Sequence, residues 1–171
     1  YNTTLVKHAG NISDRAYFAP VMKGYSIVSD PIISRTTGNQ ISVVAVPIKN
    51  SHGKVIGLMG GALNLSKLSV MIQNSSVNFE NAYSYIIDSK GTIITYHDKS
   101  YILNENITVR SALISDSLVQ ASKEILAKDQ GYVEYFHNGT KSLNYYTKIP
   151  NTYNWKLVTK IPHDYVYKPL Y

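Results

Sequence analysis

The sequence predicts an α+β fold made of two similar modules, and three observations support this prediction. The segments NSHGKVI (50–56) and DSKGTII (88–94) share the form Asn/Asp-Ser-x-Gly-x-(Val/Ile)-Ile. Both lie between apolar, β-branched stretches that are typical of strands. Each pair of strands is accompanied by a segment whose apolar residues have helical spacing. We therefore expect two copies of one module, at residues 1–78 and 79–171.

The first module is expected to contain a strand, a short helix, two hairpin strands and a second helix. The short helix has Ser13 as its candidate cap and is interrupted near Pro20. In the hairpin turn, the Asn50 side chain can bond the backbone two residues on, while Gly53 takes a left-handed dihedral. The second helix has Ser66 as its candidate cap. In chain order these elements are expected at residues 3–9, 13–24, 40–49, 54–65 and 66–77.

The second module repeats this order with one additional hairpin. Residues 82–98 predict a strand, a turn at Asp88 and a second strand, after which Asp98 caps or turns the chain. Residues 109–131 predict a helix with Gly131 as its stop signal. The dipeptide Asn138-Gly139 is a strong hairpin signal. A final strand is expected at residues 154–162, with the single tryptophan, Trp155, in the core.

Charge and residue usage exclude several classes of function. The net charge of +6 comes from scattered lysines, and the three arginines stand far apart, so we expect no nucleic-acid partner. The chain has no cysteine, and its five histidines lack a second ligand at metal spacing. No phosphate loop or nucleophile elbow is present. We therefore expect no metal, no cofactor, no catalytic residues and no enzymatic activity.

Arg15 is the residue whose surroundings suggest a binding site. It lies beside Asp14 and just before the aromatic pair Tyr17 and Phe18. A guanidinium partly enclosed by aromatic rings is costly without an anion, and its planar fork suits a carboxylate. Three interpretations are open at this point: an exposed surface charge, an ion pair with Asp14, or a contact to an anionic ligand.

Residues 14–68 resemble the Cache family of extracytoplasmic sensor domains, and in particular one module of a double Cache domain. The matching features are Asp-Arg-x-Tyr-Phe, Ser-Asp-Pro, Thr-Gly, Ala-x-Pro-Ile, Asn-Ser-x-Gly and Gly-Leu-x-Gly-Gly, in this order. They begin at residues 14, 29, 37, 45, 50 and 57. Residues 82–162 are similar to the second, membrane-proximal module, so the resemblance covers nearly the whole chain.

The resemblance implies tandem PAS-like modules, each a central antiparallel sheet flanked by helices. It also implies an extracytoplasmic part of a prokaryotic cell-membrane receptor, either a sensor histidine kinase, which we favour, or a chemoreceptor. In the intact receptor, transmembrane helices would flank the domain, and the receptor is a candidate homodimer. A long helix normally precedes the distal module, and this sequence is expected to be a piece that lacks it.

The resemblance further implies that Arg15, Tyr17 and Phe18 line a ligand pocket in the membrane-distal module, with Asp30 and Ser34 at its other rim. The amino-acid-binding subgroup has Tyr and Asp where this chain has Ile32 and Ser34, and a further Asp at about Ala62. An ammonium group therefore lacks its counter-charges. The expected ligand is a small organic anion, with a carboxylate and no amine.

One alternative function is kept beside this one. The chain could be a structural or partner-binding module of a chemoreceptor or other surface protein, without a small-molecule ligand. That alternative predicts a filled cavity in the distal module and an Arg15 paired with Asp14 or another acid. A catalytic function would instead require a cluster of titratable groups that the sequence does not show.

Overall fold

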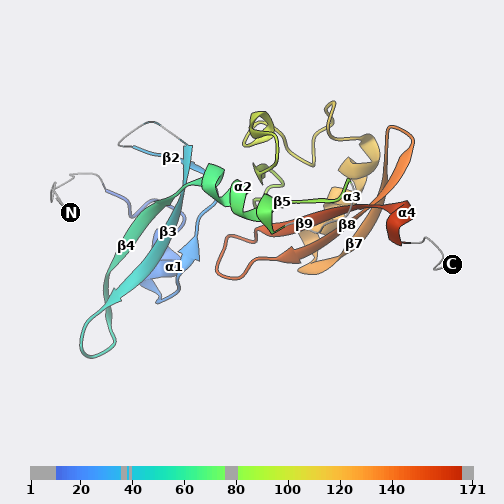
Figure 1. The fold of residues 1–171 in the computed structure, drawn as a ribbon. Coiled ribbons are helices and arrows are strands. Elements are labelled where there is room, and N and C mark those ends of the chain that lie inside the picture. Colours follow the sequence, from blue (N-terminus) through green and yellow to red (C-terminus); the bar gives the residue numbers. More distant parts are fainter. Residues whose placement is uncertain (1–10, 36–37, 39, 76–80, 167–171) are drawn as a thin grey trace. The chain divides into compact units, whose positions relative to one another are not determined.

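The computed structural model describes residues 11–35, 38, 40–75 and 81–166, and the strand expected at residues 3–9 lies outside them. The chain divides into two compact units, Tyr1–Ala62 and Leu63–Tyr171 (Figure 1). The boundary between modules expected at residues 78 and 79 stays a prediction.

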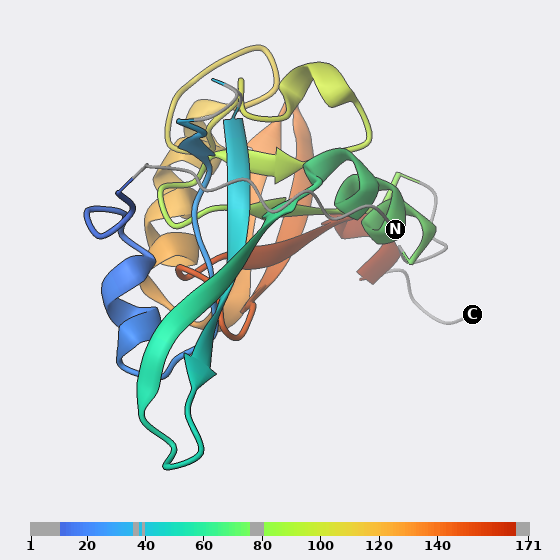
Figure 2. The ribbon, with the colours of Figure 1, turned by 90° about the vertical axis from the view of Figure 1, so that its left-hand side faces the viewer.

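The first unit is built around one long strand, β3 (Gln40–Lys49). Three strands pair with it: β1 (Ile27–Val28), β2 (Ile32–Ile33) and β4 (Val55–Leu63). β1 and β2 are antiparallel to successive parts of β3, with Ile27 opposite Ala45 and Ile32 opposite Ile41. The short helix α1 (Phe18–Met22) lies beside β3, as Figure 2 shows. The core between them consists of Tyr17, Val21, Val43 and Ala45.

Helix α1 begins later than the sequence analysis expected. Tyr17, not Ser13, occupies the N-cap position, and no side chain caps the helix. Pro20 does not interrupt it, because it is the third residue of the helix. Backbone N–H groups of the first turn have no partner within the helix, so the missing proline N–H costs nothing there.

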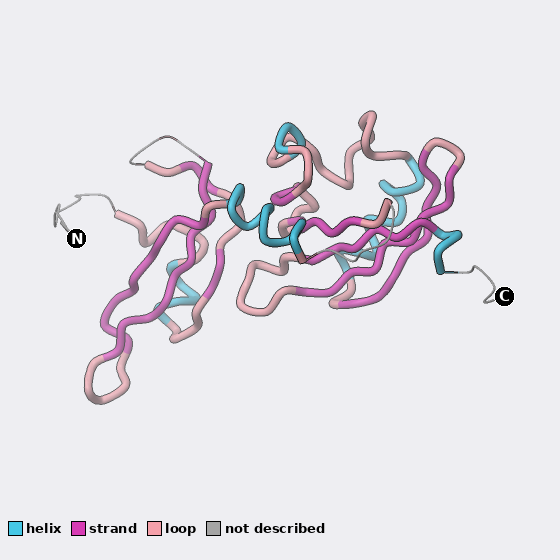
Figure 3. Tube along the Cα trace, in the orientation of Figure 1, coloured by secondary structure: helices cyan, strands magenta, loops and turns pink. Residues whose placement is uncertain are grey.

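The second unit is a five-stranded antiparallel sheet in the order β6-β5-β9-β8-β7. Figure 3 shows strands in magenta and helices in cyan. Helix α2 packs against β5 and β6, α3 packs against β7, and α4 contacts β8 and β9. The elements are α2 (Leu65–Asn74), β5 (Tyr83–Ile87), β6 (Ile93–Thr95), η1 (Lys99–Tyr101), α3 (Asp116–Ala127), β7 (Gln130–His137), β8 (Thr140–Lys148), β9 (Lys156–Pro162) and α4 (His163–Val166).

Two capping predictions for this unit are wrong, and one is confirmed. The cap of α2 is Asn64, whose Oδ1 accepts the Lys67 N–H at 2.9 Å, so Ser66 lies inside the helix. Asn is among the best N-cap residues. Helix α3 ends at Ala127 and Gly131 lies in β7, so Gly131 is not the residue that ends the helix. Asp98 does cap η1, accepting the Ser100 N–H at 2.9 Å.

Both repeated turns form as the sequence predicts. Asn50 Oδ1 accepts the N–H groups of His52 and Lys54, and Asp88 Oδ1 accepts those of Lys90 and Thr92. The glycines that close them, Gly53 and Gly91, have φ of +77° and +85°. The β7–β8 hairpin turns at Asn138 and Gly139, also with positive φ.

Gly91 should tolerate a side chain much less well than Gly139. Both have left-handed dihedrals, which cost an L-residue about 1–2 kcal/mol. An added Cβ at Gly91 would lie 3.1 Å from Asn106 Oδ1, whereas nothing lies within 4 Å at Gly139. We expect Gly91→Ala to lower the unfolding free energy by about 1–3 kcal/mol more than Gly139→Ala. Urea unfolding, followed by Trp155 fluorescence, checks this, and equal losses would contradict it.

Candidate functional site

Arg15 is held at the surface of the first unit by a bond to the backbone. It lies in the turn before α1, and its Nη2 donates to the carbonyl oxygen of Ile33 at 2.9 Å. Because Ile33 ends β2, this bond fixes the turn against the edge strand of the sheet. The guanidinium has five N–H donors, so most of its hydrogen-bonding capacity is available to a partner. The side chain is half-buried.

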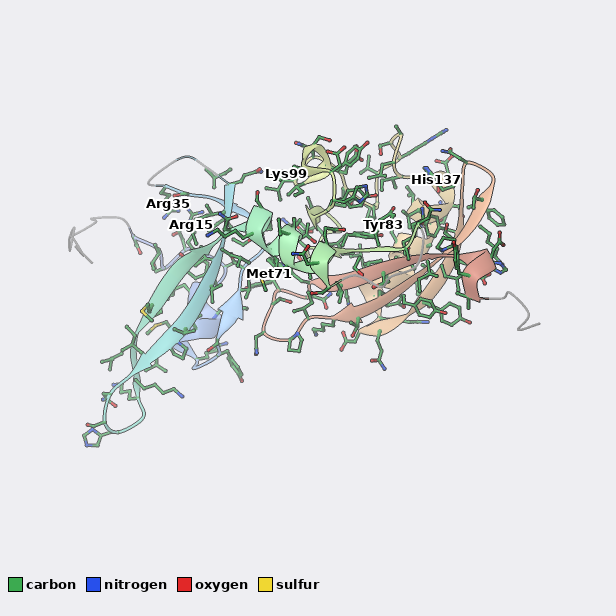
Figure 4. All side chains as sticks on the ribbon, viewed as in Figure 1. Arg15, Arg35, Met71, Tyr83, Lys99 and His137 are labelled. Atoms are coloured by element: carbon green, nitrogen blue, oxygen red, sulfur yellow. The ribbon has the colours of Figure 1, made fainter. Side chains whose placement is uncertain are left out.

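Asp14 does not neutralise Arg15. Its carboxylate forms a bidentate ion pair with Arg35, one bond of which, from Nη1 to Oδ1, measures 2.9 Å. The hydrogen bond from Arg35 holds the pKa of the Asp14 carboxyl below its usual value. Within the described part of the chain, Arg15 forms no salt bridge. Arg15 is a smaller cause of the lowered pKa of Asp14, so it lies near this ion pair without joining it, and Figure 4 labels Arg15 and Arg35 in the same part of the first unit.

The two aromatic residues after Arg15 differ in their surroundings. Tyr17 is 6% exposed and belongs to the core of the first unit. Its hydroxyl lies close enough to Arg35 to contribute to the raised pKa of that guanidinium, although Asp14 is the larger cause. Phe18 is half-buried at the start of α1. Tyr17 is therefore a core residue of the first unit, and a role for Tyr17 and Phe18 in lining a ligand pocket stays a prediction.

The remaining predicted residues lie on other elements of the same unit. Ser34 directly follows Ile33, so the Arg15 bond brings these two together. Asp30 lies between β1 and β2, where the Ser29 hydroxyl donates to its carbonyl oxygen at 2.8 Å. Ala62 is exposed on β4. The structure thus brings Arg15 and Tyr17 near the residues around Ser34, and a role in binding stays a prediction for all six residues.

A second candidate site lies in the other unit and was missed by the sequence analysis. It is a cavity of about 50 Å³ lined by tyrosines, aliphatic residues and Lys160. The signal for it was present in β9, because Lys156 and Lys160 each lie two residues from the fully buried Val158. Side chains two apart on a strand share a face, so Lys160 had to point towards the core.

In the described part of the chain, no group of three His, Cys, Asp or Glu side chains is arranged to hold a metal ion. No helix among the described residues is both long and apolar enough to cross a bilayer.

The two-unit α+β fold is that of an extracytoplasmic sensor domain of a membrane receptor. The family model dCache_1, described as a Cache domain, matches residues 1–170, and the chain belongs to this family. This confirms the resemblance, the tandem α+β fold and the location that the sequence predicted. Membership of the family also makes the domain itself a non-catalytic sensor.

The chain is similar to sensor domains of two kinds of receptor. It is 25% identical over 99 residues to the methyl-accepting chemotaxis protein PscA of Pseudomonas syringae, covering 56% of this chain and 15% of that protein. The extracellular domain of the putative histidine kinase mmHK1S-Z3 superposes with a TM-score of 0.63 at 17% identity. That match covers 86% of this chain and 53% of the other.

A third similar structure is that of a chemoreceptor with a bound ligand. The ligand-binding domain of CtaA from Pseudomonas fluorescens, in complex with L-isoleucine, superposes with a TM-score of 0.60 at 18% identity. The match covers 94% of this chain and 62% of that domain. At these identities the solved structures establish the shared fold. The chain spans less than two thirds of both solved domains.

Proposed function

We propose that this domain senses a small carboxylate-bearing molecule, bound in the first unit by Arg15. The observation that carries the proposal is that two neighbouring arginines have different partners. Arg35 takes the Asp14 carboxylate, and Arg15 is left with a backbone carbonyl as its partner. A half-buried guanidinium in this state favours an incoming carboxylate, which it can bind through two parallel hydrogen bonds.

The charge of the first unit supports an anionic ligand. Residues 1–62 contain six lysines and arginines against two carboxylates, Asp14 and Asp30. Asp14 is already engaged by Arg35. An excess of one charge raises the local concentration of ligands of the other sign and speeds their association.

Amino acids are the second candidate ligand class, because CtaA was solved with L-isoleucine. An α-ammonium group needs a carboxylate or several carbonyl oxygens nearby. The position where the amino-acid-binding subgroup has a further Asp holds the exposed Ala62 instead. The scarcity of carboxylates therefore favours acids without an amine.

A matched panel of ligands tests this choice. The panel pairs each amino acid with the acid that lacks only its amine, for example L-alanine with propionate and L-isoleucine with 3-methylpentanoate. We expect the amine-free member of a pair to raise the melting temperature and the amino acid to have a smaller effect. Sodium chloride at equal ionic strength is the control. Stabilisation by amino acids alone would contradict the amine-free assignment, and no stabilisation by either would favour a partner-binding module.

Ligand binding is proposed to signal through a conformational change that is general to this class of receptor. Ligand contacts would shift the domain between two conformations, and the change would reach the membrane helices that such receptors carry. Relatives include both a putative histidine kinase and a chemotaxis protein. The histidine kinase favoured from the sequence stays a prediction, which the domain encoded after this one in the gene would test.

A further inference from the structure

The cavity of the second unit lies on the face of the sheet that α3 covers. Tyr85, Ile87 and Val158 on this face pack with Leu118 and Ile125 of α3 in one core cluster. Towards one end of the same face the side chains become polar. There the cavity is lined by Tyr83, Tyr96, Tyr135, His137 and Lys160, with Leu118 at its apolar side. Figure 4 shows Tyr83 and His137, which β5 and β7 contribute to it.

The register of the sheet explains why a lysine lines this cavity. In the β5–β9 pair, Tyr85 lies opposite Val158 and Tyr83 lies opposite Lys160. Because successive residues of a strand alternate between faces, Lys160 shares the inner face with the fully buried Val158. Its Nζ lies 5.3 Å from the centroid of the Tyr83 ring. Lys160 is therefore an ammonium group turned inward, against an aromatic wall.

Lys156 and Lys160 lie on the same face of β9, but only Lys156 has hydrogen-bond and ion-pair partners among the described residues. Lys156 Nζ donates to the carbonyl oxygen of Lys128 at 2.6 Å and lies 3.6 Å from the Asp129 carboxylate. Lys160, within the described residues, forms neither a hydrogen bond nor an ion pair. No Asp or Glu lines the cavity. Burial lowers the pKa of Lys160, and no neighbouring acid opposes that shift.

The tyrosines supply hydrogen-bond donors next to this cation. Tyr96 donates its hydroxyl hydrogen to the Tyr83 oxygen at 2.9 Å, which leaves the Tyr83 hydrogen available for an acceptor. Burial raises the pKa of Tyr83, Tyr96 and Tyr135, so these hydroxyls stay protonated. An ammonium group and a neutral hydroxyl donor at one end of a small cavity are complementary to a carboxylate.

We propose that this cavity is a second ligand site, which binds a monocarboxylate of two or three carbons with Lys160 as its counter-ion. A water-sized atom needs roughly 10–15 Å³ of such space, so about 50 Å³ accommodates roughly three to five non-hydrogen atoms. Acetate has four and propionate five. The carboxylate would lie at Lys160 and Tyr83, and the methyl or ethyl group would lie against Leu118. The site is separate from the one proposed at Arg15.

Titration calorimetry with sodium acetate and sodium propionate at fixed ionic strength tests the proposal. The wild-type chain is compared with Lys160→Met, which keeps the aliphatic stem and removes the charge. Lys123→Met on the exposed side of α3 removes the same charge elsewhere in the unit, and Arg15→Ala removes the proposed contact of the first unit. We expect Lys160→Met to weaken propionate binding by about 30-fold or more, and the two other variants to retain a propionate site.

Two further readouts distinguish a binding role of Lys160 from a structural one. Lys160→Met should melt at a higher temperature than the wild type without ligand, because a buried charge without a partner is removed. Tyr83→Phe, which removes only a hydroxyl, should weaken propionate binding by about fivefold. Hexanoate should not compete for this site, because it exceeds the cavity.

The outcomes separate this proposal from the one at Arg15. Loss of propionate binding in Arg15→Ala alone, with Lys160→Met unchanged, would overturn the second site and support the first. Loss in Lys160→Met alone would support the second site and leave the first without a propionate ligand. Absence of any acetate or propionate binding by the wild type would overturn the second site.

Discussion

Replacing Arg15 with alanine is expected to weaken binding at the first unit by about 30-fold or more, with little change in stability. The ligand is the panel carboxylate that gives the largest thermal shift in the Lys160→Met variant, in which the cavity of the second unit lacks its counter-ion. Arg15 contributes one hydrogen bond to the fold, to the Ile33 carbonyl, at a position where water can replace it. Removing it leaves the ligand carboxylate without its charged partner. Titration calorimetry measures the affinity, and urea unfolding measures the stability.

Lys23→Ala is the matched control for this variant. Lys23 follows α1 in the same unit and is exposed, so its removal changes the net charge equally without touching the site. We expect Lys23→Ala to lower the association rate slightly and to keep the affinity within about threefold. Equal losses of affinity in Lys23→Ala and Arg15→Ala would show a general charge effect, and the assignment of Arg15 would then be wrong.

Ile125→Ala is expected to have the largest effect on stability, lowering the unfolding free energy of the second unit by about 2–5 kcal/mol. Ile125 of α3 is fully buried in the main core cluster, where it packs between the helix and the sheet. Truncation removes apolar contacts and leaves a cavity in a core that can only partly collapse. The conservative Ile125→Val should cost about 0.5–1.5 kcal/mol.

Trp155 makes this measurement specific to the second unit. It is the only tryptophan of the chain, lies just before β9 and is 2% exposed. Its fluorescence therefore reports the unfolding of that unit under urea. Val109→Ala is the control, because Val109 is 60% exposed and its truncation should change the unfolding free energy by less than about 0.5 kcal/mol. Equal effects of Ile125→Ala and Val109→Ala would contradict the packing described for α3.

The hairpins could be predicted from the sequence because their signals are local. Asn50, Asp88 and Asn138 each precede a glycine within a turn, and the turn chemistry involves only nearby backbone groups. The helix boundaries were less predictable. Ser13 and Ser66 are good caps by residue type, but Tyr17 and Asn64 occupy the N-cap positions of α1 and α2. Cap choice depends on where tertiary packing lets a helix begin, which a local pattern does not contain.

The partners of charged residues could not be predicted from their neighbours in sequence. Asp14 is adjacent to Arg15 but pairs with Arg35, because the edge strand β2 brings the following turn against the start of α1. The partner of Lys156 likewise comes from the distant segment around Lys128, whereas Lys160 lies over the Tyr83 ring. Alternation along β9 predicts which face these lysines occupy. The fold decides whether an acceptor is there.

The most direct test of the proposed ligand contact is NMR of the arginine side chains during titration with the panel carboxylate. The chain has three arginines, so the Nε–H signals of Arg15, Arg35 and Arg110 can be assigned by single substitutions. Arg110 is 74% exposed in the second unit and serves as the internal reference. We predict that the Arg15 signal shifts with saturation at the calorimetric affinity while the Arg110 signal stays unchanged. An unchanged Arg15 signal in a protein that the carboxylate stabilises would contradict the account.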